Sequence, residues 1–239
     1  MFLSPRITPD PLDILWHYAT GYMPDFLNKQ SGPVGWVRWS HRGVQYLDRF
    51  VLKQKRYVMA PQFELRFDTA FEEVVRSCAD ARRAVIREGP CETWLTDDLI
   101  AGLLRLHNLG YAHSYETWTH GKLVGGTFGI HLGGYVSMMS LFNHVSNAGK
   151  AAVGRGMMHL RDRGFKMVDI GMVPTHNVNF GGEWTPRWKF EAELAGLVHQ
   201  KVSLTDDRPC PPVPWPIRVG MPVVRTLRAV RRRLPGHAA

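Results

Sequence analysis

Apolar residues recur at regular intervals over much of the chain, and their spacing predicts a run of helices and strands between residues 70 and 170. From Ala70 to Arg87 they recur at the spacing of one face of a helix. A second helix is predicted to begin after Thr96, a residue type suited to the N-cap, and to end at Gly110, where a C-cap glycine belongs. Between these two residues, leucines at positions i, i+4 and i+7 mark the buried face.

The segment that follows shows the pattern of β-strands. Turn dipeptides at His120-Gly121 and Gly133-Gly134 separate three predicted strands, at Tyr111–Thr119, Lys122–Leu132 and Tyr135–Leu141. A helix is predicted at Ala148–Arg163, begun by Asn147 and stopped by Gly164, with a further strand at Phe165–Ile170. Helix, antiparallel meander, helix and strand is the order of the acetyltransferase-type fold. We therefore predict an α+β protein with a mixed, mainly antiparallel sheet flanked by helices.

The N-terminal part has shorter and less regular apolar segments, which predict a small α+β lobe. Trp36–Trp39 and Val44–Leu47 are short β-prone segments separated by a polar turn at Ser40–Gly43. Beyond Leu197 the chain becomes rich in proline, and extended segments are expected there. We predict a small N-terminal domain at residues 1–69, an acetyltransferase-like catalytic domain at 70–214 and a basic tail at 215–239.

Charge and composition narrow the class of protein. The formal net charge is +9, and the segment after Trp215 contributes six arginines and no acidic residue. Such a segment attracts polyanions, although a solubilising tail would have the same composition. No apolar run approaches the ~18 residues of a membrane span, and no segment resembles a signal peptide. Three widely spaced cysteines suggest neither disulfides nor zinc. We expect a cytoplasmic protein.

Several motifs between residues 20 and 190 occur in a characteristic order. They include Gly21-Tyr22-Met23-Pro24, Thr93-Trp94-Leu95-Thr96, His113-Ser114-Tyr115-Glu116-Thr117-Trp118, Leu123-Val124-Gly125-Gly126, Ser140-Leu141-Phe142 and Asp169. In these motifs the chain resembles the leucyl/phenylalanyl-tRNA-protein transferases. The resemblance implies an acetyltransferase-like core. It also implies transfer of an aminoacyl group from charged tRNA to proteins beginning with Lys or Arg, with no metal or diffusible cofactor. We expect a monomer.

The resemblance also points to site residues, and two of them depart from the family's pattern. Asp169 is the candidate to hold or deprotonate the acceptor amine. The family's glutamine is replaced by Gly171, so His176 and Asn177 on the following loop are the candidates to stand in for it. The family's glutamate is replaced by Met139, which predicts weaker recognition of a basic N-terminal residue.

The other candidates would bind the substrates. Trp94 could stack on the terminal adenine of tRNA, the alternative being a core tryptophan. The predicted substrate-binding residues are Trp94, Met138, Met139, Ser140, Leu141, Phe142, Gly171 and Glu116. Ser114 and Glu116 share a strand face from which His113 points away, which argues against a hydrolase triad. Lys53, Lys55 and Arg56 are candidates for tRNA phosphate contacts, or else solvated surface charge.

Two alternatives remain open on the sequence. An acyl-CoA-dependent N-acyltransferase would use a glycine-rich loop at a helix N-terminus, and Gly154-Arg155-Gly156 matches only the tail of that pattern, well inside the predicted helix. A non-catalytic paralogue would bind tRNA, or an anionic membrane through its arginines, without transferring anything.

Overall fold

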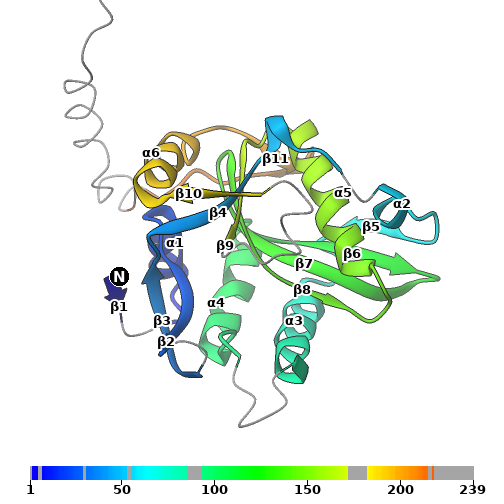
Figure 1. Ribbon diagram of the computed structural model, residues 1–239, viewed down its shortest axis with the longest axis horizontal. Helices are drawn as coiled ribbons and strands as arrows, with labels where there is room; N and C mark the ends of the chain where they lie inside the picture. The colour runs from blue at the N-terminus through cyan, green and yellow to red at the C-terminus, as the bar shows by residue number, and fades with distance from the viewer. Residues whose placement is uncertain are drawn as a thin grey trace, which may run out of the picture.

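A seven-stranded mixed sheet lies at the centre of the molecule (Figure 1). The computed structural model describes residues 2–4, 7–28, 31–52, 55–85, 93–171, 182–214 and 217. The order of the sheet is β10-β4-β9-β8-β7-β6-β5. In chain order, its strands are β4 (His41–Tyr46), β5 (Glu64–Phe67), β6 (Ala112–Thr119), β7 (Lys122–Leu132), β8 (Tyr135–Asn143), β9 (Met167–Gly171) and β10 (Glu183–Pro186). All neighbours are antiparallel except β8 and β9, so the predicted mainly antiparallel α+β architecture is confirmed.

The meander β6–β7–β8 forms where the sequence predicts it. Its first turn has His120 at φ 49° and Gly121 at φ 71°, the left-handed conformations that a tight hairpin needs. Strand β7 has the predicted bounds, and β6 and β8 differ from theirs by one and two residues. The hydrophobic period and the turn residues therefore suffice to define these three strands.

Helices cover both faces of the sheet, α3 (Phe71–Val85) and α4 (Asp97–Asn108) on one and α5 (Ala148–Asp162) on the other (Figure 1). Thr96 caps α4 as predicted, with its hydroxyl accepting the Leu99 N–H at 3.3 Å, and Gly110 has φ +80°. At the start of α5, Asn147 has φ 67° and makes no side-chain cap. Asn143 Oδ1 accepts the Gly149 N–H at 2.7 Å in its place, because the tight turn from β8 brings that amide over the first helical turn.

Helix α5 lies unusually close to the sheet because glycines line the contact. A Cβ on Gly156 would stand 2.7 Å from the Tyr115 ring, and one on Gly125 of β7 would stand 2.5 Å from the Cβ of Ala148. Arg155 donates three hydrogen bonds to backbone carbonyls around α2 (Lys55–Val58), at Val58 (2.8 Å), Ala60 (3.0 Å) and Phe63 (2.6 Å). The Gly154-Arg155-Gly156 run therefore serves packing inside a helix.

The N-terminal residues form a second, three-stranded sheet beside α1 (Pro11–Ala19). It pairs β1 (Phe2–Ser4), β3 (Ser31–Arg38) and β2 (Met23–Asn28) in that order. Strands β3 and β4 follow each other in the chain but belong to different sheets. The predicted turn at Ser40–Gly43 is wrong, because β4 begins at His41 and pairs with both β9 and β10. Since β4 and β5 belong to the central sheet, a domain boundary at residue 69 stays a prediction.

The remaining elements are short segments that come after strands of the central sheet in the chain. Helix α6 (Arg187–Leu197) continues directly from β10, η1 (Leu47–Arg49) follows β4, and β11 (Ser203–Thr205) pairs with β12 (Arg208–Pro209). Within the described ranges, no helix has the length and apolar character required to cross a membrane.

Candidate active site

An opening in the central sheet lies where the parallel strands β8 and β9 part. They pair only from Tyr135 to Ser137 on β8, after which β8 continues to Asn143 in contact with β7. Phe128 of β7 lies opposite Ser140 and the next residue opposite Met138, so Met139 is an extra, bulged residue at the opening. The split and the bulge together place backbone groups and side chains of β8 beside the end of β9.

The predicted substrate-binding residues of β8 are distributed over both faces of the sheet. Met138 and Leu141 pack with the core beneath α5, and Met139 packs with the core beneath α3 and α4. Met139, Ser140 and Leu141 are half-buried, whereas Phe142 is buried in the core. Ordinary alternation along the strand puts the neighbouring methionines on opposite sides, and the bulge puts Met138 and Leu141, three positions apart, on the same side. The structure thus brings Met139 and Leu141 to the opening and places Phe142 inside.

Asp169 is fully buried next to this opening, and its carboxylate accepts four hydrogen bonds. Oδ1 accepts from Arg42 Nε (3.2 Å) and from the Gly171 N–H (2.8 Å). Oδ2 accepts from Arg42 Nη2 (2.5 Å) and from the Tyr135 hydroxyl (2.8 Å). A carboxylate has about four lone-pair sites, so these donors saturate it. The predicted role of Asp169 as a proton acceptor is therefore not supported by its geometry.

Arg42, like Tyr135 of β8, is a site residue that sequence reasoning missed. It lies on β4, its side chain is 2% exposed, and its Nη1 also donates to the Gly21 carbonyl at 3.2 Å. Burial lowers the pKa of Arg42, but the Asp169 charge outweighs it and raises that pKa above its usual value. Burial, followed by the Asp169 charge, raises the pKa of Tyr135 well above its ordinary value. No local signal marks Arg42, because it lies in the polar segment Ser40–Gly43, which predicts a turn.

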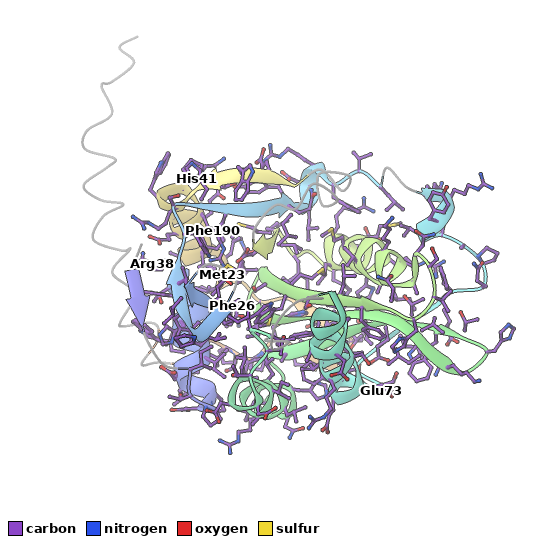
Figure 2. The ribbon with its side chains drawn as sticks, turned by 60° about the horizontal axis from the view of Figure 1, so that its bottom comes forward. Met23, Phe26, Arg38, His41, Glu73 and Phe190 are labelled. Carbon is purple, nitrogen blue, oxygen red and sulfur yellow. The ribbon has the colours of Figure 1, made fainter. Side chains whose placement is uncertain are left out.

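Gly171 ends β9 in a conformation that glycine favours, with φ +70°. A Cβ at this position would stand 3.0 Å from the Met23 Cε atom of β2. Met23 and Phe26 extend from β2 toward the central sheet (Figure 2). The small sheet therefore forms a wall beside the end of β9, next to the opening.

Other predicted residues lie elsewhere. The Glu116 carboxylate accepts from the Ala70 N–H (2.8 Å), Ser114 Oγ (2.7 Å), Trp118 Nε1 (2.9 Å) and Thr69 Oγ1, and so anchors the start of α3. Trp94 is 8% exposed and belongs to the core beneath α3 and α4. Roles for these two residues in substrate binding stay predictions that the contacts do not favour. Ser114 and Glu116 do share one strand face, as predicted.

The predicted tRNA contacts are described only in part. Lys55 and Arg56 are exposed on α2, which packs against α5. Lys53, His176 and Asn177 lie outside the described residues, as does the arginine-rich segment from 218 onward.

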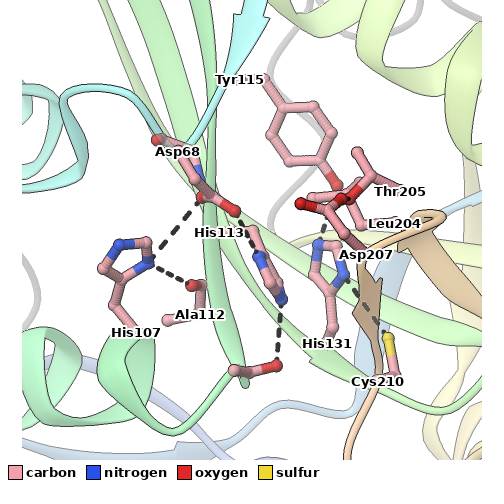
Figure 3. A network of polar contacts seen from close by, with 12 residues as sticks. Asp68, His107, Ala112, His113, Tyr115, His131, Leu204, Thr205, Asp207 and Cys210 are labelled. Carbon is pink, nitrogen blue, oxygen red and sulfur yellow. Dashed lines mark hydrogen bonds and ion pairs between the residues drawn. The ribbon is translucent and has the colours of Figure 1, made fainter.

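A second group of titratable residues lies on β6, on β7 and just after β5 (Figure 3). Asp68 accepts from the Ser114 N–H (2.8 Å) and bonds to His113 Nδ1 (2.7 Å), while His131 Nε2 bonds to the Tyr115 hydroxyl (2.8 Å). Asp68 also borders a cavity of about 530 Å³ between the start of α3 and the end of α4. Because no residue of β8 or β9 lines it, we place the candidate active site at the split instead. No group of side chains suited to a metal ion occurs among the described residues.

Comparison with known proteins decides the family. The family model described as leucyl/phenylalanyl-tRNA protein transferase matches residues 47–195, which span β5 to α6 and the whole split. This chain belongs to the leucyl/phenylalanyl-tRNA-protein transferase family. The transferase of that name from Aromatoleum aromaticum is 36% identical over 200 residues, covering 80% of this chain and 78% of the relative. The one from Xanthomonas axonopodis pv. citri is 31% identical over 223 residues, covering 92% and 84%.

Among solved structures, the C-terminal domain of a putative lysylphosphatidylglycerol synthetase from Agrobacterium fabrum aligns with a TM-score of 0.44 and 13% identity, covering 71% of this chain and 61% of that one. That likeness is too low to bear on the function of this transferase family member.

Proposed function

We propose that this protein transfers Leu, Phe or a similar apolar aminoacyl group from charged tRNA to an amine acceptor, the N-terminus of proteins beginning with Lys or Arg. The observation that carries the proposal is the family match over residues 47–195, which includes both strands that part at the opening, β8 and β9. Membership in a family of aminoacyltransferases makes the protein an enzyme of that class.

The chemistry asks for positioning more than for strong catalysis by side chains. The aminoacyl ester is already activated, so the enzyme must orient a neutral amine against the carbonyl carbon and stabilise the oxyanion. The bulge at Met139 takes a backbone N–H out of the ladder with β7 and would supply a donor at the opening. Met139 would provide an adaptable apolar wall for the aminoacyl side chain.

We also propose that the central sheet has the acetyltransferase-type arrangement. A parallel strand pair joined through α5, parted at one end and bulged on β8, supports the acetyltransferase-type arrangement. The acyl-CoA alternative is not favoured, because Gly154 and Gly156 lie inside α5 and are packed against other side chains. A monomeric state, a cytoplasmic location and a polyanion contact by the arginine-rich segment stay predictions.

A transfer assay tests the function. The protein is mixed with tRNA carrying radiolabelled Leu, Phe or Met and with peptides that begin with Lys, Arg, Asp or Ala. Label is expected on the Lys and Arg peptides. Met139→Glu restores the family's carboxylate and is expected to lower KM for those peptides without affecting the Ala peptide. Binding of charged tRNA with no transfer to any peptide would establish the non-catalytic alternative in its place.

A further inference from the structure

The carboxylate of Asp169 and its partner Arg42 together join four separate parts of the chain at the opening. Its donors come from β4 (Arg42), from β8 (Tyr135) and from the end of its own strand (Gly171). Arg42 reaches on to the Gly21 carbonyl, in the segment that leads into β2. These contacts cross from the central sheet to the small sheet at the point where β8 and β9 part.

The ion pair with Arg42 and the hydrogen bonds from Tyr135 and Gly171 fix this carboxylate in place. Arg42 and Asp169 side chains are 2% and 0% exposed, so water competes little with their ion pair. The ring of Phe190 on α6 lies 5.1 Å from the Arg42 guanidinium carbon. Among the described residues, the titratable groups that act on Asp169 include Arg42, Tyr135 and Tyr18 of α1. Among the described residues, Arg42 is the cation that balances this buried charge.

We propose that Arg42 and Tyr135 are positioning residues of the transfer reaction. They hold Asp169 as a charged anchor, and Asp169 Oδ1 in turn fixes the Gly171 N–H and the end of β9 against which the substrates are aligned. The assignment rests on the proposed aminoacyl transfer. In this assignment Asp169 is not the base that deprotonates the acceptor amine.

The reaction balances without a proton on Asp169. The neutral amine nitrogen forms a bond to the ester carbonyl carbon, and the bond from that carbon to the 3′ oxygen of the tRNA ribose breaks. The proton lost by the amine passes to the departing 3′ oxygen, directly or through water. The products are the amide and tRNA with a free hydroxyl group.

The pH profile of transfer tests the assignment in the full-length protein. In the wild type, kcat/KM for a Lys-starting peptide is expected to rise as the α-amine of the acceptor loses its proton. The pKa of an ordinary N-terminal amine is about 7.7–8.0. No further inflection of the pH profile is expected at lower pH. Arg42→Gln leaves the buried Asp169 carboxylate without its cation, and burial without a cation favours the protonated form of a carboxylate. A second inflection is then expected, with kcat on the order of 10- to 100-fold lower at pH 7.

Conservative variants separate positioning from folding. Arg42→Lys keeps the charge and is expected to remove the second inflection while restoring part of kcat. Tyr135→Phe removes one of the four donors and is expected to lower kcat severalfold with KM for charged tRNA unchanged. In Arg42→Met with Asp169→Leu, an apolar pair replaces the ion pair, which often preserves folding. This double variant is expected to fold and yet stay as slow as Arg42→Gln.

The matched control is Arg38→Gln. It breaks the ion pair of Arg38 with Glu191, which also ties the small sheet to α6 but lies outside the Asp169 cluster. This variant is expected to lose stability and to keep the wild-type pH profile. If it gains the second inflection as well, that inflection reports loosened packing and the assignment is overturned.

Two further results would overturn the assignment. One is transfer by Arg42→Gln and Tyr135→Phe at wild-type rate and with the wild-type profile. The other is a low-pH inflection in the wild type that disappears in Asp169→Asn, since that would make Asp169 a base. A wild-type protein that transfers nothing would refute the proposed function itself, and the positioning roles with it.

Discussion

Restoring the family's glutamine at position 171 is expected to damage the protein. Gly171 has φ +70°, a conformation that costs an ordinary L-residue about 1–2 kcal/mol relative to glycine. A new Cβ would also stand 3.0 Å from Met23 Cε, but that atom ends a flexible side chain and can move. The backbone conformation is therefore the main term, and Gly171→Gln is expected to lower the free energy of unfolding by roughly 1–2 kcal/mol.

Urea unfolding with unchanged m-values measures this loss, and two variants apportion it. Gly164→Ala enters the same left-handed region, at φ +91°, with its nearest neighbour 4.0 Å away, so it reports the conformational term alone. Gly171→Ala adds the Met23 contact to that term. Gly171→Asn is expected to lose less than Gly171→Ala, because asparagine enters this region more readily.

Activity provides the second readout. Because the added side chain strains the end of β9, Gly171→Gln is expected to transfer no faster than the wild type. A variant as stable as the wild type, or one that transfers faster, would refute the argument that this backbone conformation requires glycine.

Three further predictions follow from other contacts. Arg155→Leu removes three charge-assisted hydrogen bonds and is expected to lower the free energy of unfolding by roughly 3 kcal/mol or more in urea titrations; a loss below about 1 kcal/mol would contradict it. Burial, followed by the nearby His113 charge, lowers the pKa of His131 well below 6.5, so its contribution to stability is complete above pH ~6.5 and is lost as pH falls below that value. His131→Gln is expected to flatten the pH dependence of unfolding between pH 7.5 and 5, and an unchanged slope would contradict this. Lys55→Ala with Arg56→Ala is expected to weaken tRNA binding and to reduce its salt slope by about 1 per lost phosphate contact, as salt titrations would show; an unchanged slope would assign both to solvated surface.

The sequence by itself determined the elements whose signals are local. Lys122–Leu132 is a strand with the predicted bounds because its turns and its apolar pattern lie within a few residues of each other. Thr96 caps α4 as predicted because a cap needs only a side chain and an amide three residues on. The resemblance carried by these segments also sufficed to predict the family, which the match over residues 47–195 confirms.

Only the tertiary structure decided what brings distant segments together. The segment Ser40–Gly43 is polar enough to predict a turn, yet β4 runs through it because β9 and β10 supply hydrogen-bond partners on both sides. Arg42 and Asp169 stand 127 residues apart in the chain, and no local pattern marks them as partners. The buried charge of each is tolerable only beside the other, and sheet order alone places them together. Asp169 could be predicted from the sequence because it lies in a motif of the family. That four donors saturate its carboxylate became visible only in the fold, because most of them come from distant strands.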